Sequence, residues 1–226
     1  MSANYHSFRN IGFLFTQAEA ICEKWRKVFT GFDPARAVSV YGLKREGPFV
    51  YVNYFDGEYR LCCENGILEK RVPGDQAEEW TQELFMNEAM VIYHLLGDVK
   101  EGACLSGEWV PEPDLDPVRI RSGNRTDPLV GGFARAFAGR IPDLEKACIA
   151  LNGTRLERGD SSWQIHAMPL LPMQLIFWDA DEEFPAQIQV LVDRNITDLM
   201  HFEAAGCMIA DLFEKIGDLA GEAKDR

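Results

Sequence analysis

Hydrophobic positions in the first half of the chain follow a helical spacing, then several strand-like runs, then a helical spacing again. Helix periodicity covers residues 13–29. Strands are predicted over residues 37–43, 49–55, 58–63 and 67–71. Asp56-Gly57 is a favoured two-residue hairpin turn between two of these strands. Pro73-Gly74-Asp75 then breaks the pattern and caps an amphipathic helix over 76–96.

The second half again predicts strands followed by a helix. Its first part, residues 97–129, is irregular and rich in glycine and proline. Short helices are predicted over 133–137 and 142–151, and strands over 162–168, 173–178 and 186–192. The strand 173–178 is apolar on both faces apart from Gln174, which is typical of a central strand. A long helix over 196–219 follows, with Asn195 as its expected N-cap.

Strands followed by a helix, twice over, predict an α+β fold in which antiparallel β-sheets pack against amphipathic helices. An alternating βαβ pattern is not present. We expect a single globular domain over residues 1–226. If two subdomains exist, their boundary falls in the irregular segment 97–129.

Composition narrows the classes of function. The chain has 226 residues, of which 46% are hydrophobic, and no uninterrupted apolar run of membrane-spanning length. The formal net charge is −13, which disfavours nucleic acid and anionic lipid as partners. The first ten residues lack the basic-then-apolar order of a secretory signal. We therefore predict a soluble, acidic, cytoplasmic protein without a membrane span.

The six cysteines do not form a recognisable metal or redox motif, because no pair has CxxC spacing. Buried free thiols are the expected state of such residues in a cytosolic protein. Cys104 lies in the irregular segment and is the thiol that we expect to be exposed. His94 lies on an otherwise apolar helix, which favours a core histidine over a ligand.

An acidic turn separates the last two predicted strands. Asp179, Asp181, Glu182 and Glu183 place four carboxylates in five positions. Hard cations such as calcium and magnesium take oxygen ligands of this kind, so these four residues are the candidate metal ligands. The alternative is a solvated turn that prevents pairing with another chain.

The junction between the last strand and the last helix is the second candidate site. Asp193 and Arg194 lie where free N–H groups at a helix N-terminus can hold an anion. His201 and Cys207 follow on the helix, around a patch of small residues at 204–206 that favours close packing or contact with a flat cofactor. The candidate cofactor-binding residues are therefore Asp193, Arg194, His201 and Cys207, together with Trp178 beside the acidic turn.

Residues 175–186, with the sequence LIFWDADEEFPA, are followed by Val192-Asp-Arg-Asn195 and by the helix through His201. This arrangement resembles the C-terminal signature of the domain-of-unknown-function 3786 family. Residues 51–60, YVNYFDGEYR, resemble that family's first half. The resemblance implies an anaerobic bacterial or archaeal cytoplasm and a role in cofactor or corrinoid metabolism. Some members of the family carry cysteine-rich iron–sulfur segments, which this chain lacks. The family provides no established activity, so the catalytic residues and the cofactor stay unassigned.

Three hypotheses of function follow from these features. The first is a ligand- or cofactor-binding accessory protein of anaerobic metabolism, with a corrinoid or another tetrapyrrole as one class of ligand. The second is an enzyme that uses carboxylates, with or without a divalent metal. The third is a scaffold that binds a protein partner or a second copy of the chain through the small-residue face of the last helix.

Overall fold

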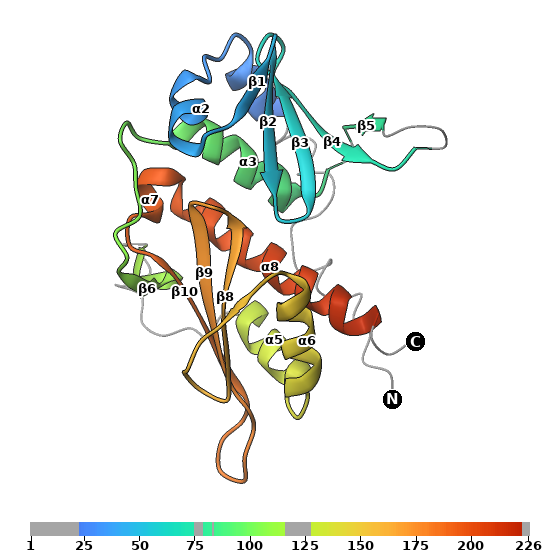
Figure 1. Cartoon of the computed structure of the whole chain (residues 1–226), viewed down its shortest axis with the longest axis vertical. Coiled ribbons are helices and arrows are strands. Elements are labelled where there is room, and N and C mark those ends of the chain that lie inside the picture. The colour runs from blue at the N-terminus through green and yellow to red at the C-terminus, as the bar shows by residue number, and fades with distance from the viewer. Residues whose placement is uncertain (1–22, 75–78, 83, 116–127, 223–226) are drawn as a thin grey trace.

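The computed structural model describes residues 23–74, 79–82, 84–115 and 128–222, which form two antiparallel sheets and several helices (Figure 1). The first sheet has the order β1 (Lys44–Glu46), β2 (Phe49–Tyr54), β3 (Gly57–Cys62), β4 (Ile67–Val72), β5 (Glu79–Thr81). The second sheet has the order β6 (Trp109–Pro111), β10 (Gln187–Asp193), β9 (Leu171–Trp178), β8 (Ser161–Met168), β7 (Thr154–Arg155). The predicted α+β class with antiparallel sheets is confirmed, and β9 is the central strand that its apolar faces indicated.

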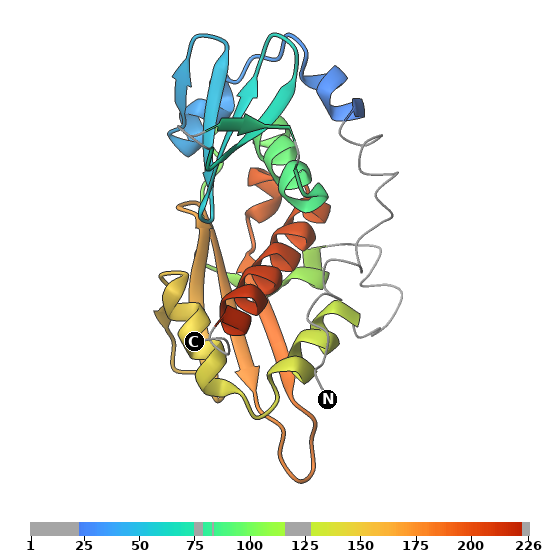
Figure 2. The ribbon, with the colours of Figure 1, turned by 90° about the vertical axis from the view of Figure 1, so that its right-hand side faces the viewer.

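The helices lie against and between the two sheets. They are a segment at 23–29, α2 (Ala35–Tyr41), α3 (Met86–Asp98), α5 (Pro128–Phe137), α6 (Ile141–Ala150), α7 (Ile196–Leu199), α8 (Phe202–Glu222) and a 3₁₀ turn η2 (Glu112–Leu115). Helix α3 packs beside the first sheet, and α8 runs from α3 past the second sheet to α6 (Figures 1 and 2). None of the described helices is long and apolar enough to cross a membrane.

One hydrophobic core includes side chains from both sheets and from the helices between them. The α3–α8 pair is central to it: the two helices pack against each other, and Ala204 and Ala205 of α8 are fully buried. Direct bonds also join the two halves: the Phe55 amide donates to the Ala167 carbonyl (2.8 Å), and the Tyr41 hydroxyl donates to the Leu199 carbonyl (2.6 Å).

The strand predicted over 37–43 is a helix in the structure. Helix α2 begins with a hydrogen bond from the Val38 amide to the Pro34 carbonyl and ends at Gly42, whose φ of 64° is left-handed. Its β-branched residues misled the prediction, because strand propensity reflects packing more than backbone preference. Ala37 is fully buried and fixes the face that this short helix turns to the core.

The helix predicted over 76–96 is divided. Residues 79–81 form the edge strand β5, and α3 begins only at Met86. Trp80 lies on β5 with its ring 4.2 Å from the Arg60 guanidinium, so its contacts are with the outer face of the first sheet. The proposed cap at Asp75 and residues 13–22 of the first predicted helix lie outside the described residues.

The first hairpin turn is shifted by one residue from its predicted position. Tyr54 pairs with Gly57, so the two turn residues are Phe55 and Asp56, and Phe55 adopts a φ of 50°. A side chain at Gly57 would meet the Tyr59 ring at 2.6 Å, which explains the glycine at the start of β3.

The last predicted helix is interrupted at Met200 and His201. Met200 is extended (φ −153°, ψ 169°), so α7 ends there and α8 starts at Phe202. Asn195 precedes α7 but makes no side-chain capping bond. Its side-chain Nδ2 instead donates to the Cys104 carbonyl (3.2 Å).

Candidate functional site

The predicted cofactor residues lie at separate places in the fold. The β9–β10 register pairs Trp178 with Gln187 and Met173 with Val192, so Trp178 and Asp193 lie at opposite ends of the hairpin. Six residues along a strand span about 20 Å. The structure therefore does not bring Trp178 and the acidic turn together with Asp193, Arg194 and His201.

The Asp193 carboxylate is buried at the end of β10 and occupies the anion position that the sequence suggested for a ligand. Its Oδ1 accepts hydrogen bonds from the Ser106 amide (3.0 Å), the Ser106 hydroxyl (2.9 Å) and the Asn195 amide (2.8 Å). Its Oδ2 accepts one from the Gly107 amide (2.8 Å). Burial alone would raise the pKa of Asp193, but these bonds together lower it below its ordinary value. Asp193 thus fixes the loop at 106–107 to the second sheet.

Arg194 and Cys207 have local partners of their own. The Arg194 guanidinium pairs with Glu108 at 2.6 Å, and both side chains are mostly exposed. Cys207 is half-buried, and burial raises the pKa of its thiol to about 12, with Asp211, Glu203 and Glu112 adding to the shift. This thiol is therefore protonated at neutral pH. Gly206 faces Glu112 of η2, where an added Cβ would lie 3.5 Å from a carboxylate oxygen.

The two aspartates of the acidic turn accept hydrogen bonds from backbone amides. Asp179 Oδ1 accepts bonds from the Gly139 and Ala180 amides, both at 2.8 Å. Asp181 Oδ1 accepts bonds from the Glu183 and Phe184 amides, and these bonds lower its pKa. Across the described part of the chain, no three His, Cys, Asp or Glu side chains are arranged to hold a metal ion.

A pair of stacked histidines is a site that the sequence did not predict as a unit. His94 of α3 and His201, between α7 and α8, lie with ring centroids 5.4 Å apart and planes at 25°. Trp25 packs its ring edge-on to His94 at 4.5 Å. His94 is only 6% exposed, yet its Nε2 has no hydrogen-bond partner. The apolar spacing around His94 indicated a satisfied core or boundary histidine; the ring is buried and Asp98 binds one of its nitrogens, while the unpartnered Nε2 was not predicted.

Hydrogen bonds at the other ring nitrogens assign the protons of this pair. His94 Nδ1 lies 2.5 Å from Asp98 Oδ2, so the ring donates there, and in the neutral imidazole the buried Nε2 is the nitrogen with the free lone pair. His201 Nδ1 accepts a bond from the Glu203 amide (3.4 Å), so the neutral ring carries its proton on Nε2. The pair therefore provides one acceptor and one donor, beside the indole ring of Trp25.

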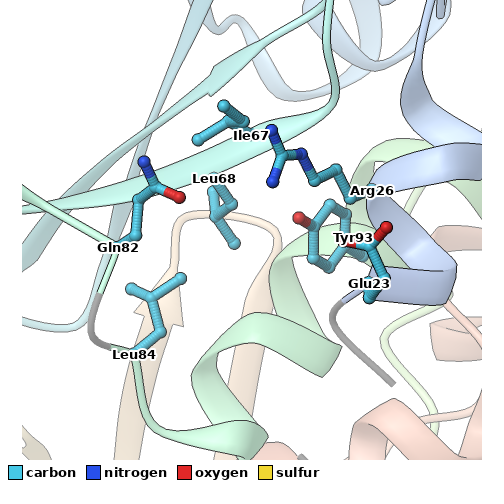
Figure 3. A pocket seen from close by; sticks show the side chains of 7 residues that line it. All are labelled: Glu23, Arg26, Ile67, Leu68, Gln82, Leu84 and Tyr93. Atoms are coloured by element: carbon cyan, nitrogen blue, oxygen red, sulfur yellow. The ribbon is translucent and has the colours of Figure 1, made fainter. Parts of the chain in front are cut away.

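A small pocket lies near this aromatic cluster, between the helix at 23–29, β4 and α3 (Figure 3). It measures about 190 Å³, below the ~300 Å³ at which pockets for drug-sized ligands begin. Tyr93 separates it from the core, and Tyr93 stacks on Trp25 with ring centroids 6.2 Å apart. Its lining residues are Glu23, Arg26, Ile67, Leu68, Gln82, Leu84 and Tyr93.

Comparison with known proteins identifies a family but no characterised relative. The sequence model described as "Domain of unknown function (DUF3786)" matches residues 33–213, which is most of the chain. No curated protein and no solved structure matches. The match includes β9, the acidic turn, β10 and both histidines of the stacked pair.

Proposed function

The chain belongs to the DUF3786 family, and we propose that this member is a ligand- or cofactor-binding protein whose ligand contacts the His94–His201 pair. The single observation that carries the proposal is the buried, unpartnered Nε2 of His94. An unsatisfied buried acceptor costs about 1–3 kcal/mol, so such an atom needs an explanation. A ligand that donates to it, or that coordinates it through a metal, supplies one.

The surroundings of His94 favour a flat ligand with a metal centre. Asp98 on Nδ1 orients the ring and favours the tautomer with Nε2 free, which is how carboxylates orient histidines that bind metals. His201 and Trp25 add aromatic faces, and the His201 side chain is 43% exposed to solvent. A corrinoid or another tetrapyrrole of anaerobic cytoplasmic metabolism meets these requirements through axial ligation.

Spectroscopy and titration test the proposal. We would purify the protein anaerobically, record its absorbance, identify released molecules by mass spectrometry, and titrate the protein with cobalamin, haem and flavin. We expect uptake of one of the two tetrapyrroles, with at least tenfold weaker binding in His94→Gln. His166→Gln is the matched control, because His166 lies exposed on β8. A colourless preparation that takes up none of these compounds would refute the proposal, as would equal affinities in wild type and His94→Gln.

A scaffold role is the second candidate, favoured by one observation at the β9–β10 turn. Phe184 is 59% exposed beside Glu182 and Glu183, and Trp178 is 39% exposed at the end of β9. Exposed aromatic side chains of this kind are enriched in interfaces. The test is the mass in solution: a monomer at high concentration without a co-purifying partner contradicts this role.

A further inference from the structure

A second buried polar cluster lies where α3 and α8 meet the first sheet. The Tyr54 hydroxyl of β2 donates to Asp211 Oδ2 of α8 at 2.8 Å, and both residues are buried. Glu88 of α3 is 5% exposed, and its Oε1 pairs with Lys70 of β4 at 2.7 Å. The other oxygen of Glu88, Oε2, is buried without a partner. Two carboxylates from different helices therefore share a buried region.

The charges around Asp211 do not balance an ionised carboxylate. Glu88 of α3 and Glu214 of α8 are like charges, and the Tyr59 hydroxyl and Cys207 thiol are neutral neighbours. Lys70 is already paired with Glu88, and Lys215 is paired with Asp56 at the β2–β3 turn. Within the described part of the chain, the Tyr54 hydroxyl is the side-chain donor that binds the Asp211 carboxylate. A buried charge with so little compensation is costly.

We propose that Asp211 holds a proton while α8 packs against the first sheet, which we call the closed state. Loss of this proton weakens the contact between α8 and the first sheet. The junction between the two sheets is then a pH-sensitive contact. This inference does not depend on a ligand at the histidines, although both sites lie on the α3–α8 pair.

The direction of the pH effect follows from the burial of Asp211. Burial is the largest cause that raises the pKa of Asp211; with the additions from Glu88 and Glu214 and the opposing effects of the Tyr54 bond and Lys215, the pKa lies at about 7. An opened or unfolded Asp211 titrates near 3.9. At pH values between these two pKa values, the closed state binds more protons than the open state. The stability of the closed state therefore falls as pH rises from about 4 to 7 and does not change with pH above 7.

Amide hydrogen exchange of the full-length protein tests the inference. Peptides from α8 and from β2–β3 would be followed from pH 5 to 8, after correction for intrinsic exchange. We expect the opening constant to rise up to about tenfold per pH unit below 7 and to reach roughly 100-fold in total. In Asp211→Asn this rise should be absent, while Asp218→Asn, exposed on the same helix, should keep it.

Two further variants separate titration of Asp211 from simple destabilisation. Glu88→Gln removes a like charge, so the pH at which the rise levels off should fall. Tyr54→Phe removes the bond to the ionised form, so that pH should rise. Shifts in opposite directions support the inference even if Asp211→Asn does not fold. An unchanged midpoint in both variants, or a pH profile in Asp211→Asn equal to that of wild type, would overturn it.

Discussion

Replacing Asp193 with asparagine tests whether this carboxylate is a structural clamp. The substitution keeps the shape of the side chain but puts an NH₂ group where one oxygen was. If the new oxygen takes the position of Oδ1, the NH₂ group faces the Gly107 amide, which now donates to Oδ2 at 2.8 Å. Two buried donors then oppose each other, and the bonds to Ser106 and Asn195 lose their charge assistance.

The expected cost is about 3 kcal/mol of unfolding free energy, because an unsatisfied buried donor costs about 1–3 kcal/mol and charge-assisted bonds are worth about 1.5–3. For a chain of this length that corresponds to a fall in Tm of roughly 6–12 °C. Urea unfolding followed by circular dichroism measures it. Ser106→Ala removes one of the four bonds and should cost about 1 kcal/mol.

The difference between wild type and Asp193→Asn should also depend on pH. The folded pKa of Asp193 is lowered, so its contribution is present above the unfolded pKa near 3.9 and is lost as pH falls below it. The two unfolding curves should therefore converge in acid. Asp198→Asn, which removes an exposed pair with Lys100, is the control and should cost less than about 1 kcal/mol. A loss below 1 kcal/mol for Asp193→Asn, or a difference that does not change with pH, would refute the assignment of Asp193 as a clamp.

Three further predictions concern the core, the surface and the thiols. Phe133→Ala should cost about 3–5 kcal/mol in urea unfolding, because Phe133 is fully buried and stacks on Phe213 at 4.2 Å. Arg194→Ala should change the unfolding free energy by less than about 1 kcal/mol, since its ion pair is exposed. Alkylation of the folded protein, read by mass spectrometry, should modify exposed Cys104 well before Cys148, which is buried and whose pKa is raised.

Periodicity predicted the parts of the fold that bury a regular face. The strands of both hairpins and the long C-terminal helix follow from it. The apolar residues on both faces of β9 predicted a central strand, and nearly all residues of β9 are buried. It failed where a short segment is fixed by one tertiary contact. The segment 35–41 is helical although its residues favour strands, and Trp80 belongs to β5 because its ring covers Arg60.

The candidate sites, like the fold, could be predicted from the sequence only in part. The sequence identified Asp193 as a candidate site residue, but three of its four hydrogen bonds come from Ser106 and Gly107, more than 80 residues away, which no spacing rule finds. The acidic turn was visible as a cluster of charge, yet two of its carboxylates bind backbone amides: Asp181 within the turn, and Asp179 at Ala180 and at Gly139 between α5 and α6. A run of carboxylates therefore did not distinguish a ligand site from a loop that holds itself together.

The stacked histidines show why sites made by helix packing escape prediction from sequence. His94 and His201 are 107 positions apart, so no local spacing in the sequence links them. They meet because α3 packs against α8, on which Ala204 and Ala205 are fully buried, and because the extended Met200 separates α7 from His201. The same packing brings Glu88 to Asp211 further along the two helices. Enlarging Ala205 should therefore disturb both clusters together, whereas His94→Gln should leave the pH response of Asp211 unchanged.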